Sequence, residues 1–239
     1  DNSIDQQFIF KSMAVKLTIG DIKYQLPERF TVTQWESLLK YDFETYRDWS
    51  KILGTALDAK PEEFELATIE SMTLAISFII ALMNQRTETV VIDFNEISFG
   101  QFVDLDIYIV QGVEKNIKPI LDILNSKTYW SDEAMWLIEQ YQKFRVHTYR
   151  AYSGLFGLND PKGDEEEDLE NIDPNKIAKG WYRIIADLAD NDVLKMDAVT
   201  DEPLKKILNF MSLRKELQLE ENFKQLQQKR KHDVSRNRK

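Results

Sequence analysis

Four acidic side chains near the middle of the chain are the first candidates for chemistry: Asp93, Glu96, Asp104 and Asp106. Carboxylates can hold Mg²⁺ or Ca²⁺, and a pair of them can act as general acid and base. A calcium-binding EF-hand loop needs oxygen ligands at fixed spacing around a glycine, and this segment lacks that pattern. We therefore expect these acids to face solvent or to lie at helix ends, and we expect no metal site.

Other patterns that support catalysis are sparse. His147 is one of only two histidines, and a general base also needs a nucleophile and an orienting partner that the sequence does not supply. We expect it to be a surface or packing histidine. The glycines form no phosphate-binding loop, and the chain has neither G-x-S-x-G nor H-E-x-x-H. Without cysteine there is no thiolate chemistry. These absences predict a protein that is not an enzyme and takes no cofactor; an enzyme would need a closed pocket with two carboxylates of raised pKa.

Aromatic side chains are dense between residues 129 and 156, and arginines accompany them. Such a segment could stack the bases of single-stranded nucleic acid while arginine neutralises phosphate. The same segment also has the spacing of a core helix, with a stripe at intervals of three and four from Leu137 to Leu155. We favour core packing combined with a protein interface. The residues expected at this interface are Trp130, Trp136, Arg145, Tyr149, Arg150 and Tyr152.

Composition and net charge indicate which classes of binding partner this chain can have. The 239 residues are 43% hydrophobic and 30% charged, enough for a sizeable core with an appendage. A net charge of −10 disfavours nucleic acid and anionic membranes over most of the surface. The final eleven residues, however, hold six Lys or Arg against one Asp. Nucleic acid or an acidic neighbouring subunit is therefore expected to bind only through this tail, at Lys229, Arg230, Lys231, Arg236, Arg238 and Lys239, unless the tail is simply solvated.

The N-terminal part of the chain predicts a β-hairpin followed by helix. Two β-rich runs within residues 14–26 flank Gly20-Asp21, where glycine supplies the positive φ of a two-residue turn. Thr33 and Glu36 have the spacing of a capping box, so we expect a helix to begin near Gln34. A short strand over residues 89–94 is a candidate for extending the hairpin.

The rest of the chain reads as helices. Residues 69–83 are apolar nearly all round, which predicts the central and most buried helix of a bundle. The longest apolar run, 74–83, is about half of the roughly 20 residues that span a bilayer, so no membrane segment is expected. Residues 99–112 fit a strand or a helix; we favour a helix capped by Ser98. Ser131 is expected to begin the longest helix of this half.

The predicted fold class is mainly α, a helical bundle with a small N-terminal β-hairpin and a C-terminal helical extension. Residues 159–173 carry eight acids against one lysine, which is typical of a linker. The expected parts are an N-terminal arm (1–13), a hairpin with a helical body (14–158), this acidic linker (159–173), a C-terminal helical pair (174–226) and a basic tail (227–239).

Three stretches carry a resemblance to a known group of proteins: IGDIKYQLP followed by TVTQW, then FGQFVDLDIYI, then PNKIAKGWYRIIADLADNDVLKMDAVTDEPLKKILNF. In order and style they resemble virion and tail-assembly proteins of tailed bacteriophages, including the crAss-like group. The resemblance implies a non-enzymatic structural subunit of the tail or a neck ring, assembled in the host cytoplasm and located in the virion. Its partners would be copies of itself and other phage structural proteins. A tail-assembly chaperone, a cargo protein and a nucleic-acid-binding protein remain the alternatives.

Overall fold

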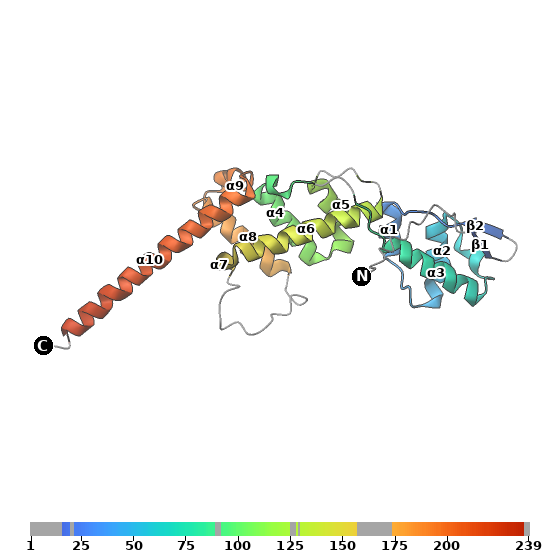
Figure 1. The fold of residues 1–239 in the computed structure, drawn as a ribbon, viewed down its shortest axis with the longest axis horizontal. Helices are drawn as coiled ribbons and strands as arrows, with labels where there is room; N and C mark the ends of the chain where they lie inside the picture. The colour runs from blue at the N-terminus through green and yellow to red at the C-terminus, as the bar shows by residue number, and fades with distance from the viewer. Residues whose placement is uncertain are drawn as a thin grey trace, which may run out of the picture. The chain divides into compact units, whose positions relative to one another are not determined.

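The computed structural model describes residues 16–19, 22–88, 92–124, 128, 130–156 and 174–236, and it is mainly helical with one small hairpin, as expected (Figure 1). The elements in chain order are β1 (Lys16–Ile19), β2 (Ile22–Gln25), α1 (Val32–Leu38), α2 (Tyr46–Leu57), η1 (Pro61–Phe64), α3 (Ile69–Met83), η2 (Phe94–Glu96), α4 (Phe99–Gln111), α5 (Val113–Ile123), α6 (Ser131–Ala151), α7 (Ser153–Phe156), α8 (Pro174–Leu188), α9 (Val193–Thr200) and α10 (Leu204–Arg236).

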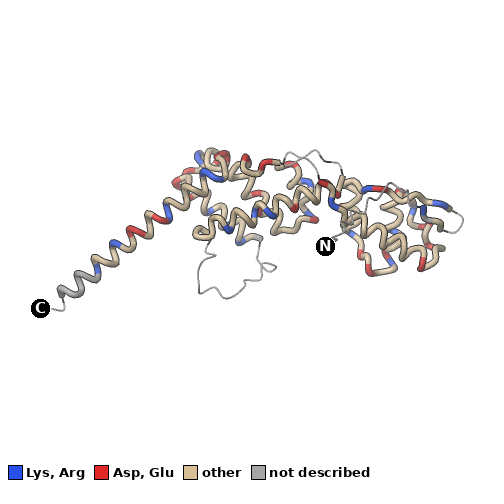
Figure 2. Tube along the Cα trace, viewed as in Figure 1, with Lys and Arg blue, Asp and Glu red and all other residues tan. Residues whose placement is uncertain are grey.

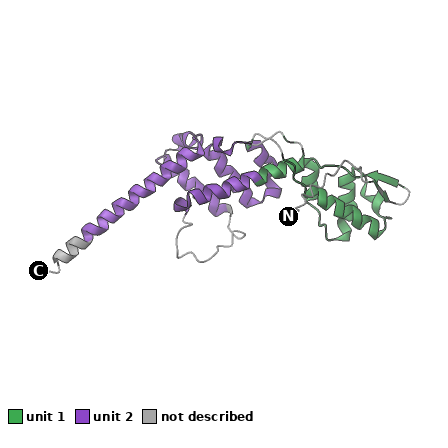
Figure 3. Cartoon of the chain, viewed as in Figure 1, with its two compact units in different colours: residues 1–90, 124–139 green, residues 91–123, 140–239 purple. Residues whose placement is uncertain are grey.

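These elements form two compact units, coloured separately in Figure 3. Unit 1 comprises residues 1–90 and 124–139, and unit 2 comprises residues 91–123 and 140–239. Helix α6 therefore supplies its first residues to unit 1 and its later residues to unit 2. The expected N-terminal arm (1–13) and acidic linker (159–173) lie outside the described residues.

The hairpin of unit 1 is confirmed. Strands β1 and β2 are antiparallel, and Leu17 pairs with Tyr24 in their register. The expected turn at Gly20-Asp21 lies outside the described residues. The predicted third strand is wrong in the part that the structure describes, because Phe94 begins the 3-10 helix η2. The Asp93 carboxylate accepts a hydrogen bond from the Asn95 backbone N–H at 2.9 Å, which stabilises a turn in place of an extended chain.

Helix α1 begins two residues earlier than predicted. Its capping box is formed by Thr31 and Gln34, whose side chains each accept a hydrogen bond from the other residue's backbone N–H at 3.1 Å. The predicted box at Thr33 and Glu36 is wrong. The backbone explains the choice, since Thr31 forms an isolated β-bridge with Trp130 and is held in extended conformation there.

Helix α3 has the predicted bounds, but it is not the most buried helix. Its inner face, including Ile76 and Ile79, is buried against the rest of unit 1. On the other face Ile69 is 61% exposed and Leu74 is 69% exposed. The prediction failed because a helix is buried all round only when other elements pack against every side of it. Within the described residues, α3 contacts only α2 and β1 extensively.

Unit 2 is built on α4, which is helical as we expected. Ser98 and Gln101 form its capping box, and Phe99, Phe102 and Leu105 are fully buried. A Cβ on Gly100 would lie 2.8 Å from Thr200 Cβ, so only glycine lets α4 approach the end of α9 this closely. The core therefore sits where α4 meets α5, α8, α9 and α10.

Helix α10 continues further than the expected helical pair. We expected the chain to become a solvated tail near residue 227, but residues 227–236 remain helical. Lys, Arg and Gln are good helix formers, which explains the continuation. Leu204, Ile207 and Leu208 anchor the beginning of α10 in the core of unit 2, and every residue from 213 to 229 is exposed.

Candidate functional site

The most completely buried charged group in the described residues is the Asp106 carboxylate, in helix α4 of unit 2. Asp106 is 0% exposed to solvent. Arg145 Nε donates to Oδ1, Tyr149 Oη donates to Oδ2 at 3.0 Å, and Trp181 Nε1 donates to Oδ2 at 2.8 Å. The expectation that Asp106 faces solvent or lies at a helix end is wrong, because it lies in the middle of α4 on the side that α6 and α8 cover. Asp104, two residues away, is exposed as expected.

Electrostatics at the Asp106 centre favour an ion pair surrounded by neutral hydroxyls. Burial alone would lower the pKa of Arg145, but the charge and hydrogen bond of Asp106 raise it above its usual value. Burial, followed by the charge of Asp106, also raises the pKa of Tyr149 and of Tyr141. The Tyr141 hydroxyl is buried without a hydrogen-bond partner among the described residues. Both tyrosines therefore stay protonated at neutral pH.

The Asp106 centre connects three helices. Asp106 belongs to α4, its hydrogen-bond donors come from α6 and α8, and both carboxylate oxygens accept hydrogen bonds. The Trp181 ring also lies edge-on to Phe102, with ring centroids 5.9 Å apart, and contacts Phe99 at 5.8 Å. A carboxylate held by three donors is suited to fixing helices in place, because a single lost donor leaves buried charge unsatisfied.

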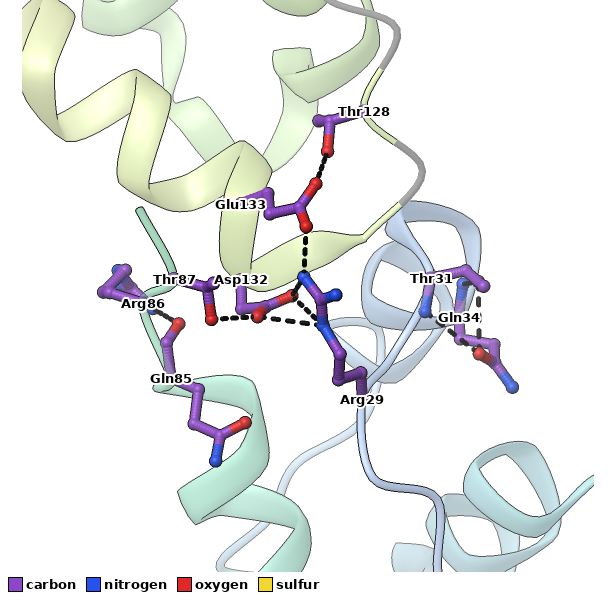
Figure 4. Close-up of polar contacts among 9 residues, drawn as sticks. All are labelled: Arg29, Thr31, Gln34, Gln85, Arg86, Thr87, Thr128, Asp132 and Glu133. Atoms are coloured by element: carbon purple, nitrogen blue, oxygen red, sulfur yellow. Dashed lines mark hydrogen bonds and ion pairs between the residues drawn. The ribbon is translucent and has the colours of Figure 1, made fainter. Parts of the chain in front are cut away.

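Unit 1 contains a second polar centre, around Arg29 (Figure 4). The guanidinium donates to both oxygens of Asp132, with Nε at 3.0 Å from each, and its Nη2 reaches Glu133 Oε1 at 2.6 Å. Thr87 Oγ1 donates to Asp132, and Thr128 Oγ1 donates to Glu133 at 2.5 Å. Asp132 is buried, with 4% exposure. This centre joins the segment before α1 to the first turn of α6, where acids also suit the helix dipole.

The six expected interface residues do not share one role. Trp130 and Trp136 belong to unit 1 and are half-buried, and the Arg29 guanidinium lies 4.9 Å from the Trp130 ring centroid. The other four belong to unit 2. Among these, Arg145 and Tyr149 are internal partners of Asp106. Tyr152 Oη donates to Asn209 at 2.8 Å, and Arg150 is exposed. The sequence pattern located a packing stripe correctly but did not separate internal from surface positions.

Lys229 is exposed on α10, as expected for the basic tail. The side chains of Arg230, Lys231 and Arg236, and all of Arg238 and Lys239, lie outside the described part of the structure. Figure 2 shows the described charges along the chain, with basic residues recurring on the exposed part of α10. His147 is exposed, in agreement with the surface alternative.

Two exposed apolar surfaces escaped sequence reasoning. The first, which we call the α3 face, comprises Ile69, Thr73, Leu74, Ser77, Ile80 and Ala81, all exposed. The second, the α10 stripe, comprises Leu219, Phe223 and Leu226, which are 59%, 62% and 57% exposed. The signal for the α3 face was its apolar composition all round. The signal for the α10 stripe is the spacing of four and three residues between its members, which lie within an otherwise polar segment.

Comparisons with protein-family models, with curated proteins and with solved structures give no match to this chain. Among the described residues, His, Cys, Asp and Glu do not gather into any group of three or more that could hold a metal ion. In that same part of the chain, no helix is both long enough and apolar enough to cross a membrane.

Proposed function

We propose that this chain is a non-enzymatic structural subunit of a tailed-phage particle, in the tail or a neck ring, and that it acts through contacts among many copies. The observation that carries the proposal is the outer part of α10. Residues 213–229 are all exposed, and five of them are large and apolar. These five are Leu213, Leu217, Leu219, Phe223 and Leu226.

A helix with this many exposed apolar side chains is expected to pack against another protein surface. Most helical stability in proteins comes from packing of an apolar face against a neighbour, and the apolar residues of this part of α10 have no such neighbour within the described residues. Apolar surface removed from water contributes about 25 cal/mol per Å². Contiguous exposed apolar surface is also a mark of protein interfaces. The exposed α3 face adds a second such surface to the same chain.

The phage setting is supported by the resemblance of the three stretches described above. In that setting the partners are copies of this chain and other phage structural proteins, and the location is the virion. A tail-assembly chaperone is the second candidate, and the α3 face favours it, because an exposed apolar helix face can hold a segment of another protein before assembly.

Mass spectrometry of purified particles of the encoding phage tests the proposal. A structural subunit is present in washed particles at a fixed number of copies per particle. An assembly chaperone is abundant in the infected lysate and absent from those particles. A cargo protein remains in full particles but is lost when they are emptied. Absence from particles would contradict the structural proposal, and a known capsid protein of the same phage serves as the internal standard.

A further inference from the structure

We infer that the α10 stripe of one copy docks on the α3 face of a second copy. The inference rests on the proposed function, because it specifies the contact through which copies assemble. The occupant is a second copy of this chain, since one chain carries both surfaces, and unit 1 and the outer part of α10 carry opposite net charges.

The α10 stripe has the geometry of a docking helix. Leu219, Phe223 and Leu226 lie at positions i, i+4 and i+7, which places them on one side of an α-helix. This is the anchor spacing of amphipathic helices that bind in apolar grooves. The exposed charges within the stripe are mixed, since Lys224 pairs with Glu220 at 4.0 Å and Glu221 lies beside them, while Lys229 lies just beyond the stripe.

The α3 face is suited to close approach by a helix. Thr73 Oγ1 donates to the Ile69 carbonyl at 2.8 Å, and Ser77 Oγ donates to the Thr73 carbonyl at 2.8 Å. Because both hydroxyls are already satisfied within the helix, a partner can displace water from them without leaving a buried donor unpaired. Thr73, Ser77 and Ala81 are small, whereas Ile69 and Leu74 supply exposed apolar surface beside them.

Charge complementarity selects the pairing. The described residues of unit 1 hold 14 Asp and Glu against 8 Lys and Arg, a net charge of −6. The outer part of α10, residues 213–236, holds 7 Lys and Arg against 4 Asp and Glu, a net charge of +3. Glu65, just before α3, and Glu70, in its first turn, are exposed and can meet basic residues of an arriving α10. Opposite charges of this kind favour encounter and suppress wrong pairings.

A symmetric pairing of α10 with itself is disfavoured by the same helix. The exposed apolar residues do not keep a heptad, because Leu213 and Leu217 lie on a different side from Leu219 and Phe223. Pairing two copies of α10 side by side in parallel would also bring their basic segments together. Contact between two different surfaces is heterologous, and it generates a ring when the rotation closes and a filament when it does not.

Engineered cysteines test the contact, and the chain contains no cysteine to interfere. One preparation carries Ser77→Cys and another carries Phe223→Cys, and the two are mixed at micromolar concentration and oxidised. The matched control replaces Phe223→Cys with Gln225→Cys, an exposed position on the other side of α10. Circular dichroism of each variant checks that the helical content equals that of the parent chain.

We expect a disulfide-linked dimer of Ser77→Cys with Phe223→Cys, formed on the order of tenfold faster than with the control, because held thiols have a high effective concentration. Preferential Phe223→Cys homodimers would show that α10 pairs with itself and would overturn the inference. A double variant that closes its disulfide within single chains would show an internal contact and would also overturn it. If the parent chain assembles but the mixture links no faster than the control, the inference fails while the proposed function stands. A parent chain that stays monomeric contradicts both.

Discussion

The indole Nε1 of Trp181 donates a hydrogen bond of 2.8 Å to the buried carboxylate of Asp106, although the two residues are 75 positions apart in the chain. This contact fixes α8 to α4 inside unit 2. It is reinforced by Arg145 and Tyr149 from α6, so a single carboxylate sets the positions of three helices. The stability of unit 2 should therefore depend on Asp106 far more than on Asp104, the other acid of α4.

Replacing Asp106 removes the buried partner of the half-buried Arg145. We expect Asp106→Asn to lower the free energy of unfolding by about 3–5 kcal/mol, because breaking a buried ion pair leaves Arg145 uncompensated. The control is Asp104→Asn, exposed on the same helix, which should stay within about 0.5 kcal/mol of the parent. Chemical denaturation followed by circular dichroism measures both. Equal changes in unfolding free energy for the two substitutions would show that the contacts of Asp106 do not stabilise unit 2.

Trp181→Phe keeps an aromatic ring in the cluster but removes the indole donor. The expected loss is about 1–3 kcal/mol, the penalty for a buried acceptor that loses one hydrogen bond. Hydrogen exchange should locate the effect, with faster exchange of α8 amides and unchanged exchange in α1 and α2. Tyr182→Phe, at the neighbouring exposed ring, is the control. Unchanged α8 protection in Trp181→Phe would contradict this role of the indole.

Raising the pH above 10 should destabilise unit 2. The pKa of Tyr149 is raised in the folded state above the ordinary value of 10.0, by burial and by the charge of Asp106. The contribution of Tyr149 to the free energy of unfolding is therefore fully present below pH 10. It is lost as the pH rises above 10, because Tyr149 releases its proton in the unfolded chain before it does so in the folded chain. Tyr149→Phe should flatten the decline in unfolding free energy above that pH. A variant that declines as steeply as the parent would contradict the assignment.

In unit 1, Arg29→Lys should be damaging although the charge is retained. A lysine ammonium cannot reproduce the planar fork that serves Asp132 and Glu133 together, and Asp132 is buried. We expect a loss of about 1–3 kcal/mol in urea unfolding. Arg47→Lys, on the exposed surface of α2, should change stability by less than about 0.5 kcal/mol. If both variants unfold at the same urea concentration, the Arg29 centre does not stabilise unit 1.

Local patterns predicted much of the fold. The apolar run gave the bounds of α3, and Ser98 marked the beginning of α4, because caps and periodicity act between residues near in sequence. Helix α1 shows the limit of this reasoning. Two candidate capping boxes overlap there, and the bridge between Thr31 and Trp130, distant in sequence, selects the first.

The buried centre and the exposed surfaces were beyond local patterns. Asp106 differs from Asp104 only in the side of α4 that it occupies, and its burial depends on Arg145 and Trp181, which only the tertiary fold brings near. In the same way, the composition of α3 shows that it is apolar but not whether a neighbour covers it. These are properties of packing between elements, which hydrophobic periodicity does not record.

Light scattering coupled to size-exclusion chromatography tests most directly whether this chain works by joining copies. The single chain has a mass of 28.1 kDa. At micromolar concentration and low salt we expect a discrete mass that is a multiple of this value and that falls as salt screens the charges of α10 and unit 1. Removal of residues 213–239 should abolish the larger species. A mass of one chain at every concentration and salt would contradict the account.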